Sequence, residues 1–209
     1  MFEPPNLNEE KKLIAQGYKL VAGIDEAGRG SLAGPVVAAA VVLSDNKDLS
    51  QLNSVRDSKE ISSKKRNFLY GVIREEAEAF GIGIVGPEII DSINILKATM
   101  LAMRKAVDQL PFLPHFLLID GNRTPQITIM NKGIVNGDKL CLSIACASII
   151  AKVTRDYIMV ELDKYYPGYR LAKNKGYGTM GHLSCLEKLG PSPIHRYSFA
   201  PVKRNVTLI

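Results

Sequence analysis

The 209-residue sequence has no tryptophan, and aromatic residues make up only 7% of it. So few rings do not favour a stacking platform of the OB-fold kind for single-stranded nucleic acid. The sequence also has only three cysteines, an odd number without CxxC spacing, which argues against a disulfide framework and against a zinc site. We interpret Cys141, Cys146 and Cys185 as reduced core thiols of a cytoplasmic protein.

Long hydrophobic runs are missing too. The longest, near residues 35–43 and 140–151, are too short to cross a bilayer. Residues 1–12 are polar and acidic, which is not typical of a signal peptide. The motifs GxxxxGKS/T, GxSxG and HExxH are absent, so a nucleotide loop, a serine hydrolase and a zinc protease lack support. We therefore expect a cytoplasmic protein with no membrane partner.

The hydrophobic content of 46% is enough for one domain with a real core, perhaps carrying a small appendage. The net charge of +6 is unevenly distributed. Basic and acidic residues balance, 17 of each, up to Ala151, whereas 10 basic and 4 acidic residues follow from Lys152 onward. A basic final quarter indicates either a polyanionic partner or a solvated basic face, and charge alone does not decide between them.

Residues 23–35, Gly-Ile-Asp-Glu-Ala-Gly-Arg-Gly-Ser-Leu-Ala-Gly-Pro, form the stretch around which the chain is organised. A short strand precedes this stretch, and an apolar run rich in β-branched residues, typical of a fully buried strand, follows it. Carboxylates at the end of a buried strand are costly unless a cation pairs with them. The adjacent acids Asp25 and Glu26 therefore indicate either a divalent metal site or a strand that ends in a solvated turn.

The spacing of these two acids adds a condition. Successive side chains on a strand point to opposite faces, so Asp25 and Glu26 can converge only if the strand gives way there, which Gly28 and Gly30 would permit. Two more acids, Asp120 and Asp138, follow an apolar strand and occupy a turn, respectively. Carboxylates gathered at one sheet edge bind Mg²⁺ or Mn²⁺, and two such ions can promote phosphodiester hydrolysis.

The remaining pattern alternates strands with helices. We predict strands over residues 19–25, 35–43, 79–85, 115–121 and 125–130. We predict helices that begin at Asn8, after the N-cap Ser62 and at Pro87, and helices over residues 95–110, 140–165 and 180–189. Residues 137–139 are predicted as a turn, and residues 168–179 as loops. Adjacent early strands followed by crossover helices indicate an α/β fold, a mixed sheet flanked by helices.

Five stretches resemble the ribonuclease HII family, in the family's order and over most of the chain. They are residues 23–35; Asp-Ser-Lys at 57–59 with Lys-Lys-Arg at 64–66; Leu-Ile-Asp-Gly at 118–121; residues 137–156; and residues 175–196, from Lys-Gly-Tyr-Gly-Thr to Pro-Ile-His-Arg. The resemblance implies an RNase H-like mixed central sheet flanked by helices, with a C-terminal helical extension. We expect residues 1–165 to form the catalytic domain, and residues 166–209 to pack on it as part of one structural unit.

The resemblance also implies a reaction and its residues. The family hydrolyses RNA in RNA–DNA hybrids and cuts on the 5′ side of single ribonucleotides embedded in duplex DNA, leaving a 3′-hydroxyl and a 5′-phosphate. Its metal-binding acids correspond to Asp25, Glu26, Asp120 and Asp138. Its reader of the ribose 2′-hydroxyl corresponds to Gly28, Arg29 and Gly30, and its junction-sensing tyrosine to Tyr177. The 2′-hydroxyl is the group that distinguishes RNA from DNA.

Several further assignments are weaker. We assign Lys59, Ser148 and Lys152 to phosphate contacts, with ordinary surface charge as the alternative. Asp156 rivals Asp138 as the fourth acid, although an ion pair or helix contact is the simpler interpretation. The histidines His182 and His195 fit structural roles at least as well as catalytic ones.

The sequence departs from the family pattern in four places. These are Cys146 for alanine, Glu60 for lysine, Asn174 for histidine, and Met180-Gly181 for a charged pair. They bear on details of DNA-side binding rather than on the reaction. Residues 1–17 leave no room for the N-terminal domain of the sister type, ribonuclease HIII, and residues 205–209 lack a clamp-binding peptide.

We therefore predict a monomeric, two-metal ribonuclease HII. Two other functions stay open from the residues alone. A non-catalytic hybrid-binding protein would bind in EDTA without turnover when metal returns, although four acids facing phosphate would not help such a protein. A different metal-dependent nuclease on the same fold, such as a junction resolvase, would cut all-DNA junctions.

Overall fold

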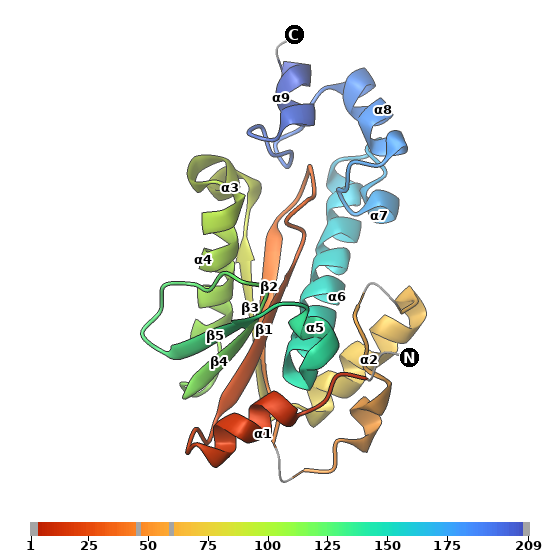
Figure 1. The fold of residues 1–209 in the computed structure, drawn as a ribbon. Helices are drawn as coiled ribbons and strands as arrows, with labels where there is room; N and C mark the ends of the chain where they lie inside the picture. The colour runs from red at the N-terminus through yellow and green to blue at the C-terminus, as the bar shows by residue number, and fades with distance from the viewer. Residues whose placement is uncertain (1–3, 45–46, 59–60, 207–209) are drawn as a thin grey trace.

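The computed structural model describes residues 4–44, 47–58 and 61–206. Its centre is a five-stranded sheet in the order β3-β2-β1-β4-β5 (Figure 1). The strands are β1 (Val21–Ala27), β2 (Val36–Val42), β3 (Ala79–Val85), β4 (Phe116–Asp120) and β5 (Met130–Ile134). The first three strands are antiparallel neighbours, whereas β4 runs parallel to both β1 and β5. The predicted mixed sheet is confirmed.

Helices cover both faces of this sheet. The helices are α1 (Asn8–Ala15), α2 (Ser63–Glu76), α3 (Pro87–Ile93), α4 (Ile95–Asp108), α5 (Gly137–Leu140), α6 (Leu142–Tyr165), α7 (Leu171–Asn174), α8 (Met180–Leu189) and α9 (Ala200–Val206), with a 3-10 turn η1 (Ser50–Ser54). One face of the sheet packs on α4, and the other packs on α6 with α2 beside it (Figure 1). Every residue of β2 is buried, as its unbroken apolar sequence predicts.

Local signals set the ends of several elements. Ser62 is the N-cap of α2, as predicted, because its hydroxyl accepts a hydrogen bond from the Lys65 amide at 3.2 Å. Pro87 occupies the first turn of α3, where its missing N–H costs nothing. Asn94 caps α4 by accepting from the Lys97 amide at 3.1 Å. These caps lie within one or two residues of the predicted boundaries.

The prediction of a strand over residues 125–130 was wrong. The fifth strand begins at Met130 and runs through Asn131, Lys132 and Gly133, and it is at most half-buried along its length. An edge strand that is exposed in this way needs no apolar alternation, so the sequence signal was missing. Residues 125–129 instead form an irregular loop whose Ile129 packs into the core beside α4.

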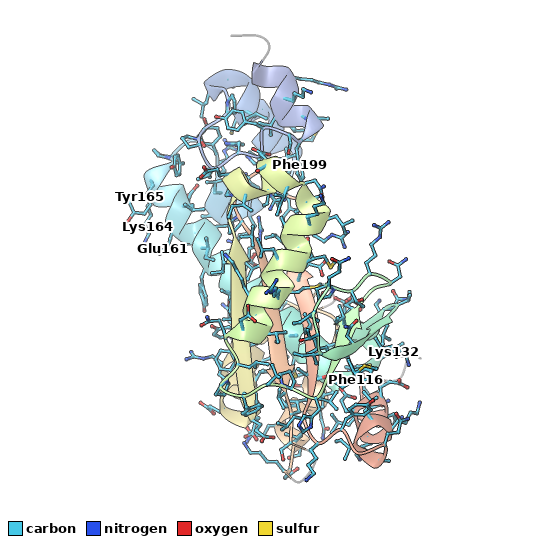
Figure 2. All side chains as sticks on the ribbon, turned by 90° about the vertical axis from the view of Figure 1, so that its left-hand side faces the viewer. Phe116, Lys132, Glu161, Lys164, Tyr165 and Phe199 are labelled. Carbon is cyan, nitrogen blue, oxygen red and sulfur yellow. The ribbon has the colours of Figure 1, made fainter. Side chains whose placement is uncertain are left out.

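The C-terminal extension consists of α7, α8 and α9 and lies beyond the end of the sheet where the β1–β2 hairpin turns (Figure 1). Phe199 joins it to the body, since its ring packs against both the core under α4 and the small cluster around Leu186 and Val202 (Figure 2). Asp91 of α3 adds a polar tie by accepting from the Tyr197 and Ser198 amides at 2.8 and 2.9 Å. The predicted helical extension is confirmed, whereas the domain boundary at residue 165 stays a prediction.

No helix among the described residues is both long and apolar enough to span a membrane. Of the three predicted core thiols, Cys141 and Cys146 are buried and Cys185 is partly buried, and all three are free. Burial raises the pKa of the Cys141 thiol to about 12. Two residues that the sequence singled out, Lys59 and Glu60, lie outside the described residues.

Candidate metal centre

Three aspartates converge on the sheet face that α6 covers. In the parallel pair β1–β4, Ile24 lies opposite Ile119, which brings the next residues, Asp25 and Asp120, side by side. Asp138 joins them from α5, the short helix that follows β5. One carboxylate oxygen from each of the three aspartates lies within 4.8 Å of the others. The structure thus brings three of the four predicted acids together, and their role as metal ligands stays a prediction.

The third aspartate is held in place through the second. The Asp120 carboxylate accepts hydrogen bonds from the Gly137 amide at 2.7 Å and, more weakly, from the Asp138 amide at 3.4 Å. These are the first amides of α5, which point their N–H groups at the negative charge. The predicted turn at residues 137–139 is in fact this helical turn, and it fixes Asp138 beside β4.

Ser148 of α6 holds the Asp25 carboxylate in position. The Ser148 hydroxyl bonds the Asp25 carboxylate and also lies 2.9 Å from the Ser58 hydroxyl. Both serines are buried, and Arg66 fixes the Ser58 backbone by donating to its carbonyl at 2.8 Å. Ser148 is only 3% exposed, so the structure places it under the acidic site and not on a surface open to phosphate.

The electrostatics of the three aspartates suit a hard divalent cation. Asp25 is 4% exposed, and burial together with the charges of Glu26 and Asp120 raises its pKa well above the usual range for a carboxyl. Crowded, buried carboxylates of this kind gain most from a positive ion, and oxygen donors are the ligands that Mg²⁺ and Mn²⁺ prefer. The donor set therefore fits the predicted cofactor.

Glu26 does not belong to the same close group. The strand β1 continues through both acids to Ala27, so the expected break after Asp25 is absent, and this prediction was wrong. Pairing with β2 continues as far as Ala27–Val37, which keeps the backbone extended and turns successive side chains to opposite faces. The Glu26 carboxylate instead accepts from Arg29 at 3.1 Å, although its charge still acts on Asp25.

A second wall of the site forms where two loops meet. Ser31 of the glycine stretch pairs with Tyr177 in an isolated antiparallel bridge, and the Leu32 amide donates to the Gly176 carbonyl at 2.8 Å. Gly176 has a φ of +78°, and a side chain there would overlap the Ala33 carbonyl. The predicted 2′-hydroxyl reader and the predicted junction sensor thus lie side by side, although 146 positions separate Ser31 from Tyr177 in the sequence.

The Tyr177 ring is flanked by cations. The ammonium of Lys152 lies 5.4 Å from its centroid, and the guanidinium carbon of Arg155 lies 5.3 Å from it. Lys152 also pairs with Asp156 at 2.6 Å, and Asp156 lies 3.8 Å from Arg66. Asp156 is therefore engaged in ion pairs and stands apart from the three aspartates, as the simpler interpretation held.

Two buried arginines fasten these loops to the body, and sequence reasoning missed both. Arg155 donates to the carbonyls of Pro35, Lys175 and Ala33 at 2.9, 2.8 and 3.1 Å. Arg196 donates to the carbonyls of Gly34, at 2.9 and 3.1 Å, and of Arg29, at 2.9 Å. Helical spacing could have found Arg155, because it follows Ser148 and Ala151 along the buried stripe of α6.

A pair of buried histidines continues the same network. The Ser192 amide donates to Nδ1 of His195 at 3.0 Å, and the two Nε2 atoms of His195 and His182 lie 3.1 Å apart. Nδ1 of His182 lies 3.0 Å from the Tyr177 carbonyl, an acceptor. Only one pattern satisfies all three bonds: neutral His195 donates to neutral His182, which donates to Tyr177. The structural role weighed for these histidines is thereby supported.

The other predicted residues are placed as follows. Arg29 and Gly30 are exposed at the loop surface, where a ligand can reach them, whereas Gly28 is buried against Arg155. Asn174, one of the departures from the family pattern, is buried and shapes the loop: its side chain donates to the Tyr169 carbonyl at 2.7 Å and accepts from the Gly176 amide at 2.8 Å. The asparagine at this position therefore acts by fixing the shape of the loop, and its side chain is engaged within the protein.

Comparison with known proteins identifies the family of a chain with this acidic group and these paired loops. Residues 22–202 match the family described as Ribonuclease HII. The chain belongs to the ribonuclease HII family. Ribonuclease HII of Dehalococcoides mccartyi is 54% identical over 95% of this chain and 94% of its own length. Ribonuclease HII of Desulfitobacterium hafniense is 53% identical over 97% of this chain and 77% of its own length.

Solved structures agree on the fold. The ribonuclease H2 of Pyrococcus horikoshii OT3 superimposes with a TM-score of 0.74 at 24% identity, over 90% of this chain and 98% of that one. The RNase HII of Archaeoglobus fulgidus, solved in a complex with PCNA, gives a TM-score of 0.64 at 26% identity, over 81% of this chain and 87% of that one. The RNase H-like fold and the enzyme class, a metal-dependent endoribonuclease of the ribonuclease H type, are thus established.

Proposed function

We propose that this ribonuclease HII hydrolyses the RNA strand of RNA–DNA hybrids and cuts on the 5′ side of single ribonucleotides embedded in duplex DNA, leaving a 3′-hydroxyl and a 5′-phosphate. The observation that carries the proposal is the convergence of three aspartates within 4.8 Å beside the paired glycine and tyrosine loops. A nuclease centre next to two loops that can inspect a sugar is what such a reaction needs.

Asp25, Asp120 and Asp138 would hold Mg²⁺ or Mn²⁺, and the neighbouring charge of Glu26, which acts on Asp25, would add to the attraction for the cation. When bound as a pair, such ions activate water and stabilise the leaving oxygen of a phosphodiester. The chain contributes the positioning of these carboxylates: Ser148 holds Asp25, and the start of α5 holds Asp120. Burial keeps competing solvent away from the acids.

Substrate choice would belong to the second wall. The exposed backbone of Gly30 and the neighbouring Arg29 can approach a ribose closely, since a Cβ placed on Gly30 would meet no described atom within 4 Å beyond its chain neighbours. Tyr177, held by its cations and by His182, would lay its ring against the adjoining deoxyribose, where an extra hydroxyl would not fit. Lys152 and the basic final quarter would contact phosphates, while Lys59 keeps this role only as a prediction.

The proposal includes a cytoplasmic, monomeric enzyme that takes part in ribonucleotide removal from DNA. The archaeal relative was solved in a complex with PCNA, a partner that we do not extend to this chain.

Asp120→Asn tests the catalytic role directly. The asparagine oxygen can still accept from the Gly137 amide, so the fold is kept while the charge is lost. We expect cleavage of a DNA duplex carrying one ribonucleotide to fall by at least about 10²-fold in Mg²⁺ or Mn²⁺. Asp108→Asn, the same change at an exposed position of α4, is the matched control and should cut as the wild type does.

The wild-type products decide between the functions weighed above. A single cut 5′ of the ribonucleotide, with an uncut all-DNA duplex, supports the proposal. If the enzyme cut long hybrids only, the proposed single-ribonucleotide activity and the proposed role of Tyr177 would both be wrong. Binding of hybrid without any cutting would indicate the non-catalytic protein, and cutting of all-DNA four-way junctions would indicate a resolvase.

A further inference from the structure

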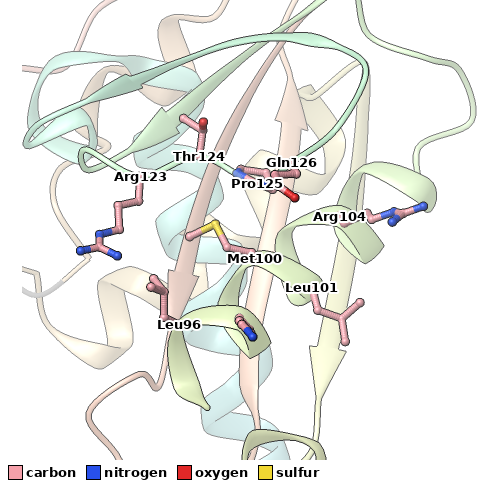
Figure 3. Close-up of a pocket in the computed structure, with 9 residues that line it drawn as sticks. Leu96, Met100, Leu101, Arg104, Arg123, Thr124, Pro125 and Gln126 are labelled. Carbon is pink, nitrogen blue, oxygen red and sulfur yellow. The ribbon is translucent and has the colours of Figure 1, made fainter. Parts of the chain in front are cut away.

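A groove of about 680 Å³ lies between α4 and the loop that joins β4 to β5, away from the face where the three aspartates meet α6 (Figure 3). Its apolar lining comes from Leu96, Met100 and Leu101 of α4 and from Pro125 of the loop. The three α4 side chains are only partly buried, so they present apolar surface to solvent. The catalytic proposal makes no use of this groove.

The rim of the groove carries charge of one sign. Lys97, Arg104 and Arg123 all line it and are exposed, and no acidic residue of the described chain lines it. None of these three cations forms an ion pair with a described carboxylate. Figure 3 shows Arg123 and Arg104 at opposite ends, with Met100 between them. The pattern is an apolar floor bounded by unpaired positive charges.

We propose that this groove binds a short acidic peptide segment with apolar side chains, supplied by a partner protein. The carboxylates would pair with the cations at the two ends, and the apolar side chains would cover the floor. Methionine at the centre adapts readily to different apolar side chains. A groove of this size gives a small interface, so the contact suits transient recruitment rather than permanent assembly.

A nucleic acid fits the groove less well. A phosphodiester backbone satisfies the three cations but leaves Leu96, Met100 and Leu101 uncovered, because it has no apolar groups to place on them. The loop begins immediately after Asp120, so a peptide here would tether a partner beside the catalytic edge. The acidic site, which lies on the other side of the sheet from the groove, would stay open to substrate.

Fluorescence anisotropy with a labelled synthetic peptide tests the proposal on the full-length chain. The probe is a peptide of about 12 residues that combines aspartates with leucine and phenylalanine. A second peptide keeps the aspartates and replaces the apolar residues by serine, and a short DNA duplex serves as competitor. Arg104→Glu and Arg123→Glu reverse the charge at each end of the groove. Lys105→Glu, the neighbouring exposed cation of α4 outside the lining, is the matched control.

The expected result is binding of the apolar acidic peptide, weakened about tenfold by Arg104→Glu and by Arg123→Glu and unchanged by Lys105→Glu. The serine peptide should bind at least about tenfold more weakly than the apolar one. Cleavage of a hybrid by Arg104→Glu should match the wild type, which separates this site from the catalytic proposal.

Three outcomes would overturn the proposal. Absence of binding at about millimolar peptide would show that the groove takes no such ligand. Binding of the serine peptide with the same affinity as the apolar peptide would make the groove a polyanion site for nucleic acid. Displacement of the probe by duplex DNA would mean the same if Arg104→Glu weakened DNA binding as much as peptide binding. Equal weakening by Lys105→Glu would show that only the overall charge of α4 matters.

Discussion

Gly28 and Gly30 stand two residues apart in the loop after β1, yet their surroundings differ. Gly28 has a φ of +93°, and a side chain there would run into the Arg155 guanidinium. Gly30 has no such φ, and a side chain there would meet no described atom within 4 Å. The first glycine is therefore required by the fold, whereas the second leaves space that a substrate can occupy.

Gly28→Ala and Gly30→Ala should separate these roles. We expect Gly28→Ala to lower the free energy of unfolding by about 2–4 kcal/mol, from backbone strain and from displacement of Arg155. Gly30→Ala should change it by less than about 0.5 kcal/mol while reducing hybrid cleavage about tenfold. Urea unfolding and a cleavage assay on both variants check this. Similar stability losses in the two variants would contradict it.

Helix α8 is tied to the tyrosine loop by the histidine pair. Burial lowers the pKa of His182, and burial together with the charge of His182 lowers the pKa of His195 to about 4. Both rings must be neutral for the chain of hydrogen bonds from Ser192 to Tyr177 to hold. A proton gained by His182 at Nε2 would set two N–H groups facing each other across the 3.1 Å contact. A proton gained by His195 at Nδ1 would instead face the Ser192 amide, which is also a donor.

Stability should therefore fall as the pH drops from about 6.5 toward about 4. In that window the unfolded chain binds a proton at His195 and the folded chain does not, so acid favours unfolding. We expect a contribution of about 2 kcal/mol, measured as the free energy of unfolding across this range. His195→Gln keeps a donor toward His182 but cannot titrate, so its profile should be flatter. Parallel profiles for the two proteins would refute the assignment.

At the scale of the whole molecule, the C-terminal extension shares its interior with the catalytic body. Ala33 of the glycine loop and Met159 of α6 pack with Tyr169, Leu171 and Ile194. Arg155 bonds carbonyls on both sides of this boundary. An interface that buries apolar side chains and two arginines is expected to unfold together with the rest of the chain.

We expect one cooperative thermal transition for the full chain. Far-UV circular dichroism reports helices throughout the chain. Tyrosine fluorescence is weighted toward the extension, because four of the 8 tyrosines lie there, at positions 166, 169, 177 and 197. The two signals should give the same midpoint, and a chain that ends at Tyr165 should unfold at a lower temperature because Arg155 and Met159 lose their partners. Two separate midpoints would show that residues 166–209 unfold on their own.

Much of this architecture is encoded locally. The apolar run of β2, the periodic face of α4 and the Ser62 cap are each readable from neighbouring residues, because burial on one face repeats with the period of the element. The order of the five motifs gave the family and with it the three aspartates. The edge strand β5 was misplaced because exposure leaves no such repeat.

What the sequence by itself determined is therefore the first four strands, the longer helices, the family and the residue types of the acidic site. Only the tertiary structure decided which polar groups meet: Asp138 joins the site through Asp120, Glu26 stays on the other face, and Ser148 lies beneath Asp25. It also decided the bonds of Arg155 and the cation-rimmed groove on α4. The physical reason is that apolar periodicity is a local property, whereas a buried polar group is satisfied by partners that are distant in the chain.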